Sequence, residues 1–239
     1  MPTVISWADE TWNPTTGCSR VSDGCRYCYA EGISLRFGWS KKPWTRRNAA
    51  ENVVLHPERL RKPYAWKTAR RVFVDSMADL FHERVPDDYI ALVFAVMNDL
   101  PQHIFLVLTK RPERAAAWPG PWGRNIWMGT SVESPRVKTR IDNLRTCTAQ
   151  TRFLSCEPLL ADLGPLDLRG IHWVIVGGES GYHIGQHPER HMDHAWARRI
   201  RDQCLAADPP VAFFFKQSSG PRTEMGTELS PPPYQPPTT

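Results

Sequence analysis

Much that would place this 239-residue chain in a common class is absent from its sequence. No apolar run approaches the roughly 20 residues that a membrane-spanning helix needs, so no membrane partner is expected. The N-terminus, MPTVISWADE, has no basic stretch followed by an apolar one, which predicts a cytoplasmic protein without a signal peptide. Neither a G-x-x-x-x-G-K-[ST] phosphate loop nor a G-x-S-x-G nucleophile elbow is present, so neither of those enzyme classes is expected.

Cysteine is scarce too, with six residues in the chain, but three of them lie together. Cys18, Cys25 and Cys28 have the spacing C-x6-C-x2-C, and in a reducing compartment such grouping indicates metal binding rather than disulfides. A closed structural zinc site uses four ligands, usually from two paired loops, and no second C-x2-C pair is present. Three thiolates from one loop instead fit a 4Fe–4S cluster with one open iron, and structural zinc is the weaker alternative.

Short apolar runs recur along the chain, with helical patterns between them. The runs cover residues 72–74, 104–108, 126–128, 152–154, 173–176 and 211–215, and a further strand is expected near residues 5–12. Continuous runs of this kind are typical of parallel strands that are buried on both faces. Helices are expected over residues 86–97, 134–144 and 193–205, the last with Asp193 as its N-cap.

This alternation predicts an α/β fold of βαβ units joined by right-handed connections. About seven parallel strands in a chain of 239 residues fit a partial or closed (β/α) TIM-like barrel better than a short doubly wound sheet. We expect one barrel domain over residues 1–227, with the cysteine loop at residues 18–28. Residues 228–239, ELSPPPYQPPTT, predict a disordered proline-rich tail.

Polar residues follow the predicted strands at their carboxyl ends, which is where α/β barrels place their active sites. Five charged residues at these ends are candidates for lining a substrate pocket: Asp75, Lys110, Glu133, Glu157 and Lys216. At another strand end, Gly177 and Gly178 either allow close backbone approach by a ligand or mark a tight turn. Together with Glu179 they are candidates for binding a cofactor.

The net charge of +5 is concentrated in one segment. Residues 36–71 carry eleven Lys or Arg against two acids, with five Phe, Trp or Tyr interleaved. Cationic side chains bind phosphates, and aromatic rings stack on bases, so this composition predicts contact with nucleic acid. The residues expected to make this contact are Arg46, Arg47, Arg61 and Lys62. The alternative is a solvated surface arm with its tryptophans packed inward. A histidine group at residues 183–194 could bind a second metal, although Gly185 and Pro188 interrupt it.

Seven stretches of the sequence resemble a known family. They are Trp12-Asn13-Pro14 with the cysteine loop, VFVDSMADLFHE (72–83), VLTKRPER (107–114), GTSVE (129–133), RFLSCEPLL (152–160), VIVGGESG (174–181) and FFFKQ (213–217). On these motifs the chain is similar to a phage-associated, three-cysteine family of unknown function, itself related to the radical S-adenosylmethionine superfamily. The stretches span nearly the whole chain in order.

The relation to that superfamily implies a partial barrel whose first strand leads into the cluster loop. It implies that the open iron chelates the amine and carboxylate of S-adenosylmethionine, and that a reductant protein supplies an electron. With the basic segment, it leads to the hypothesis of a radical S-adenosylmethionine-like enzyme that acts on a nucleotide or nucleic acid.

Two departures from the superfamily pattern favour a second hypothesis. The superfamily spacing is C-x3-C-x2-C, and its Gly-Gly-Glu follows an early strand, whereas residues 177–179 follow a late one. Cys156 lies at a predicted strand end, and as a fourth ligand it would close the cluster. The alternative is then a non-enzymatic iron–sulfur protein with four protein ligands that binds nucleic acid or senses redox state.

Overall fold

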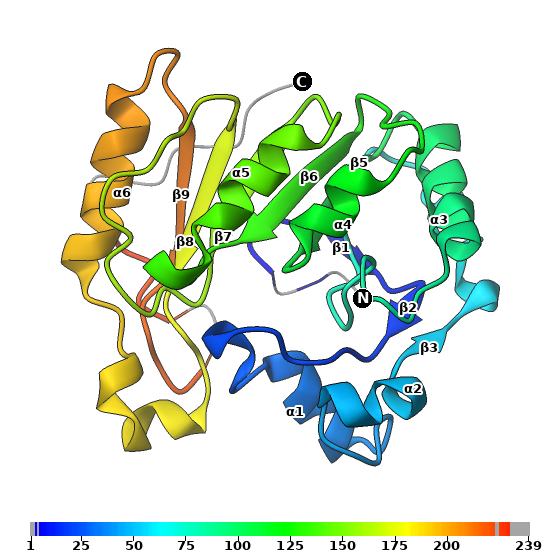
Figure 1. The fold of residues 1–239 in the computed structure, drawn as a ribbon, viewed down its shortest axis with the longest axis horizontal. Coiled ribbons are helices and arrows are strands. Elements are labelled where there is room, and N and C mark those ends of the chain that lie inside the picture. Colours follow the sequence, from blue (N-terminus) through cyan, green and yellow to red (C-terminus); the bar gives the residue numbers. More distant parts are fainter. Residues whose placement is uncertain (1–2, 4, 223–224, 230–239) are drawn as a thin grey trace.

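The computed structural model describes residues 3, 5–222 and 225–229. A sheet of seven parallel strands, in the order β1-β4-β5-β6-β7-β8-β9, curls into a half-barrel (Figure 1). The strands are β1 (Glu10–Trp12), β4 (Arg71–Val74), β5 (Ile104–Thr109), β6 (Ile126–Ser131), β7 (Arg152–Cys156), β8 (Trp173–Gly177) and β9 (Ala212–Gln217). Because spatial order follows chain order, β1 and β9 form the two outer edges. The prediction of a partial barrel is confirmed, and the closed form is wrong for the described residues.

Helices cover the convex face of the sheet, and the remaining elements lie at its carboxyl end. The covering helices are α3 (Asp87–Asp99), α4 (Pro112–Ala117), α5 (Thr139–Thr146) and α6 (His194–Ala206). At the carboxyl end lie α1 (Tyr29–Arg36), α2 (Ala49–Asn52) and a two-stranded antiparallel sheet of β2 (Thr15–Thr16) and β3 (Val54–Leu55). Short 3-10 helices occur at Asp23–Cys25, Arg46–Asn48, Pro57–Arg59, Lys62–Ala65, Pro135–Val137, Tyr182–Gln186 and Pro188–Arg190. Within the described ranges, no helix has the length and apolar character of a membrane span.

The curled sheet separates two hydrophobic cores, which explains why the strands are apolar throughout. Alternate side chains of a strand point to opposite faces. Val72 and Val74 of β4 therefore join the core beneath the helices, whereas Phe73 joins the concave core. The concave core is largely aromatic, and Trp7 packs there against Phe73 with ring centroids 4.6 Å apart.

The expected strands and helices are all present, with ends shifted by a few residues. Asp193 caps α6 as predicted, since its carboxylate accepts a hydrogen bond from the N–H of Ala195 at 2.7 Å. The sequence did not predict α2, α4 or the β2–β3 pair, because elements of two to six residues show no periodicity. Residues 230–239 of the predicted tail lie outside the described residues.

Candidate functional site: two adjoining cavities at the mouth of the half-barrel

The cysteine loop lies across the carboxyl ends of the strands, where the arrowheads in Figure 1 point toward α1. Cys18, Cys25 and Cys28 line one small cavity of about 130 Å³. That volume is roughly ten times the ~10–15 Å³ that one water-sized group requires. The fold thus brings the three predicted ligands together around a space suited to a group of several atoms.

A buried ion pair fastens the start of the loop to the sheet. Arg111 follows β5, and its guanidinium contacts the Asp79 carboxylate at 3.1 Å. The same guanidinium donates to the backbone carbonyl and the hydroxyl of Ser19 at 3.0 and 3.1 Å, and to Cys18 Sγ at 3.6 Å. Charge-assisted bonds of this kind are short and directional, so Arg111 holds the first cysteine in place.

The other end of the loop is fastened by residues that come late in the chain. The buried Glu133 carboxylate accepts from the Gly24 N–H at 3.4 Å and from Arg140 Nη1 at 2.9 Å. Tyr27 stacks on His183 with centroids 4.0 Å apart, and its hydroxyl lies 2.8 Å from His187 Nε2. Glu133 therefore positions the loop rather than lining either cavity, although the sequence predicted it at the substrate pocket.

Burial of the cysteine loop makes the charged thiolate forms of Cys18 and Cys28 unfavourable in the free protein. Burial, together with the negative charge of Asp79, raises the pKa of the Cys18 thiol to about 12, although Arg111 opposes the shift. Burial also raises the pKa of Cys28, and the charge of Lys110 opposes it. The thiols of Cys18 and Cys28 are therefore protonated when free, and a metal group would have to displace those protons. Arg111 and Lys110 would then offset the charge of the resulting thiolates.

Each carboxylate that lines the small cavity is already engaged at both oxygens. Asp75 accepts from the N–H and the hydroxyl of Thr15, at 3.0 and 2.7 Å. Asp79 accepts four hydrogen bonds, from two backbone N–H groups, a hydroxyl and a guanidinium. Glu31 binds the Arg20 guanidinium and one backbone N–H. These carboxylates are therefore occupied as structural acceptors and are poorly placed to act as a fourth ligand.

Cys156 lies away from the cysteine loop. Its side chain is fully buried in the core between sheet and helices, whereas its neighbour Ser155 faces the concave side and lines the larger cavity described next. Cys204 belongs to the same core, and burial raises the pKa of the Cys156 thiol. Among the described residues, no three His, Cys, Asp or Glu side chains converge as ligands of a single ion. A multi-atom cluster holds its ligands further apart than one zinc ion, which binds thiolates at ~2.3 Å.

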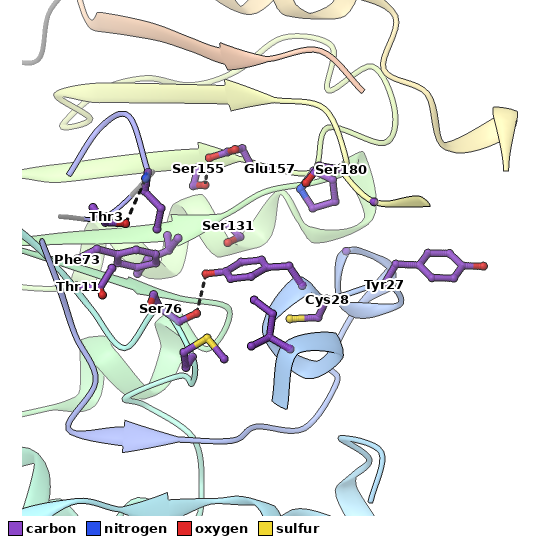
Figure 2. A pocket seen from close by; sticks show the side chains of 18 of the residues that line it. Thr3, Thr11, Tyr27, Cys28, Phe73, Ser76, Ser131, Ser155, Glu157 and Ser180 are labelled. Carbon is purple, nitrogen blue, oxygen red and sulfur yellow. Dashed lines mark hydrogen bonds between the residues drawn. The ribbon is translucent and has the colours of Figure 1, made fainter. Parts of the chain in front are cut away.

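A larger cavity of about 970 Å³ adjoins the small one and shares part of its wall, including Cys28, Lys110 and Ser131. Figure 2 shows that its wall brings together Cys28 from the loop with Ser131, Ser155 and Glu157 from the sheet side. Lys216 also lines it, and its Nζ contacts Glu157 Oε1 at 3.0 Å. Of the five charged residues predicted at a pocket, Lys110, Glu157 and Lys216 line this cavity, and Asp75 lines the small one.

The Gly177-Gly178-Glu179 segment has structural partners of its own. A Cβ on Gly177 would lie 2.6 Å from Glu157 Oε1, and one on Gly178 would lie 2.3 Å from the Ser219 nitrogen. Packing therefore requires glycine at position 178, where the obstacle is backbone, whereas at position 177 it is the flexible side chain of Glu157. Glu179 binds the Arg190 guanidinium through both oxygens, and His183 Nε2 lies 3.2 Å from it. Gly178 and Glu179 also line the larger cavity, whereas Gly177 lies behind it.

The basic segment forms a folded surface rather than a separate arm. Arg46, Arg47 and Arg61 are exposed, and Lys62 donates to the Thr11 carbonyl at 2.9 Å beside β1. Trp44 and Trp66 are turned inward, whereas Phe37 and Trp39 are exposed. In the part of the chain that the structure describes, the histidines of residues 183–194 do not converge on one point: His191 Nε2 contacts the Ile184 carbonyl, and His194 Nε2 the Ser218 hydroxyl.

Asp79, Arg111, Tyr27 and Arg190 were not among the predicted site residues. Arg111 and Arg190 bind backbone carbonyls of the cysteine loop, Asp79 pairs with Arg111, and Tyr27 is the loop residue that stacks on His183. Asp79 and Arg111 do follow predicted strands, so their place at the rim was visible. Their pairing was not, because it depends on which neighbouring strands come together.

A family model described as "Protein of unknown function (DUF5131)" matches residues 2–228. The chain belongs to this family. No curated protein and no solved structure matches the chain significantly. The family description assigns no activity, so function must be argued from the two cavities.

Proposed function

We propose that this protein is an iron–sulfur enzyme of the radical S-adenosylmethionine type that acts on a nucleotide or nucleic acid. Cys18, Cys25 and Cys28 would hold a 4Fe–4S cluster in the small cavity. The larger cavity would receive S-adenosylmethionine and the substrate. One observation carries the proposal: the three cysteines surround a single space that adjoins a chamber large enough for two ligands.

The partners of the carboxylates support an open iron. The acids in the small cavity are engaged as acceptors, and Cys156 lies in the core beneath the helices. A fourth ligand would therefore come from the larger cavity, across the shared wall. When bound, the cluster and S-adenosylmethionine supply one-electron chemistry that generates a radical for hydrogen abstraction from a substrate.

The residues of this chain would position the reactants and tune the cluster. The bond from Arg111 to Cys18 Sγ would stabilise the thiolate, and hydrogen bonds to cluster sulfurs raise the reduction potential. Lys110 lies at the wall between the cavities, held by a 3.1 Å bond to the Ser131 hydroxyl. The Glu157–Lys216 pair offers a carboxylate and an ammonium to polar ligand groups in the chamber. At about 970 Å³, the chamber is at the upper end of the ~300–1,000 Å³ typical of ligand sites.

Anaerobic reconstitution with iron and sulfide tests the proposal. The expected product is a brown protein that loses its iron when Cys18, Cys25 or Cys28 is replaced by Ser. Cys156→Ser and Cys204→Ser are matched controls in buried positions and should keep it. With S-adenosylmethionine and a strong reductant, release of 5′-deoxyadenosine is expected.

Other results of this reconstitution would contradict the proposal or favour its alternative. A colourless, iron-free protein, or one that holds only zinc at the three cysteines, contradicts the proposal. Loss of the cluster in Cys156→Ser, with no response to the cofactor, favours the four-ligand alternative that binds nucleic acid or senses redox state. That alternative is not an enzyme and has no need of a reductant protein as a partner.

A further inference from the structure

Two aromatic side chains lie exposed beside the larger cavity. Phe37 and Trp39 are 62% and 63% exposed, and their rings stack with centroids 5.6 Å apart at an angle of 26°. Contiguous apolar groups on a surface often mark a site of contact with another molecule. Trp39 also lines the larger cavity, so the pair forms part of its entrance.

The surface around this pair is strongly basic. Residues 32–50 contain five Lys or Arg and no acid. Arg36 lies over the Phe37 ring at 5.7 Å, and Lys42 pairs with Glu51 at 2.7 Å. Among the described residues, Arg46 and Arg47 take part in no ion pair within 4.0 Å, and both are exposed. The charges of Arg46 and Arg47, nine and ten positions after Phe37 in the chain, are therefore available to an anionic partner.

Aromatic groups continue from this entrance into the chamber. Tyr29 lines both cavities and is half exposed, with its hydroxyl donating to the Ser76 carbonyl at 2.7 Å. Trp7 and Phe73 from the concave core line the chamber further in. A flat ring can thus contact aromatic faces from the surface to the interior.

We propose that the chamber takes a base of a single-stranded nucleic acid, which enters across the Phe37–Trp39 pair while the cations of residues 36–47 bind the flanking phosphates. Stacking platforms combined with backbone cations are how proteins bind single strands, and unpaired bases alone expose their faces. An acidic protein would satisfy the cations but would leave the chamber and its aromatic wall unused. The inference rests on the proposed function in that the inserted base is the group on which the chamber acts.

Fluorescence anisotropy tests the inference, with labelled single-stranded DNA, single-stranded RNA and the matching duplexes of mixed sequence. The double variant Phe37→Ala/Trp39→Ala should weaken single-strand binding about 10-fold or more, without changing its dependence on salt. The triple variant Lys41→Ala/Arg46→Ala/Arg47→Ala should instead reduce the slope of log K against log salt by about 2, since each phosphate contact contributes ~0.7. Leu92→Ala and Arg169→Ala remove an exposed apolar group and an exposed charge elsewhere, and should bind like the wild type.

The inference is overturned if the wild type binds no single strand, if duplexes bind as tightly, or if the aromatic variant binds unchanged. Whichever of single-stranded RNA and single-stranded DNA binds more tightly shows which sugar the protein prefers. Iron content is measured on the same preparations after reconstitution. A protein that binds iron but no single strand contradicts this inference alone. A protein that binds a single strand but no iron contradicts the proposed function alone.

Discussion

The two cavities at the mouth of the half-barrel differ in how their polar groups are satisfied. Around the small cavity Asp79 accepts four hydrogen bonds, and the guanidinium of Arg111 contacts two carboxylates, a hydroxyl, a carbonyl and a thiol. Around the large cavity, Lys110 Nζ contacts only one hydroxyl in the described residues, and Lys216 pairs with one carboxylate. A saturated network resists change, whereas a sparse one can rearrange around a ligand. The small cavity is therefore suited to a permanent group and the large one to molecules that come and go.

Among the variants that test this contrast, Arg111→Ala is expected to lose the most unfolding free energy. It leaves the buried Asp79 carboxylate without its cation, and breaking a buried pair in this way costs about 3–5 kcal/mol of unfolding free energy. Urea denaturation of the metal-free protein measures the loss. Arg169→Ala is the matched control, because its side chain is 88% exposed and an ion pair at such a position contributes little to stability. Equal losses in the two variants would show that the network around the small cavity is not rigid.

Gly17→Ala should have the next largest effect, because Gly17 directly precedes the first cysteine. Its φ of 82° is in the left-handed region, and a Cβ would lie 1.8 Å from the backbone oxygen of Asn52. Strain of this kind costs roughly 1–3 kcal/mol in unfolding free energy. Gly32→Ala in α1 is the control, since nothing lies within 4 Å of the added Cβ, and it should be neutral or stabilising. A Gly17→Ala protein as stable as Gly32→Ala would contradict the close packing around Gly17.

Asp75 allows a test of a different kind, through pH. Burial raises the pKa of Asp75 from 3.8 to about 7, with the Thr15 hydrogen bonds opposing the shift. The folded state therefore binds this proton more tightly than the unfolded state. The stabilisation is present below pH 4 and is lost as pH rises toward 7, at roughly 1 kcal/mol per pH unit. Asp75→Asn should remove this component from urea titrations of the metal-free protein. A variant curve that parallels the wild type over that range would show that Asp75 is ionised throughout.

Lys216→Met should have the smallest effect on stability, although it removes one partner of an ion pair. The Glu157 carboxylate left behind faces a cavity of about 970 Å³, where water can solvate it. We expect a change of at most about 1 kcal/mol in unfolding free energy, with a larger effect on ligand binding in the chamber. Lys216→Met/Glu157→Gln, which removes both charges, is the control. A loss as large as that of Arg111→Ala would show that the two cavities are built alike.

The sequence could predict the elements of this fold but not how its side chains pair. The apolar runs and the Asp193 cap are local patterns, so the strands, the helices and the partial barrel followed from them. Three cysteines in one loop were likewise placed together by their spacing. Pairings such as Arg111 with Ser19, which are 92 residues apart, depend on the curvature of the sheet. Glu133 shows the limit most clearly, because a charged residue at a strand end lies buried against Gly24 rather than facing a pocket.

The contact between Tyr27 and the segment after β8 bears on when the protein is completed in the cell. Tyr27 and His187 are separated by 160 positions in the chain, and Arg190 Nη2 binds the carbonyl of Asp23 at 3.2 Å. During translation the cysteines emerge first, long before these clamping residues leave the ribosome. A maturation factor that delivered a metal group early would find its ligands without their surroundings. Loading is thus expected to follow synthesis of almost the entire polypeptide.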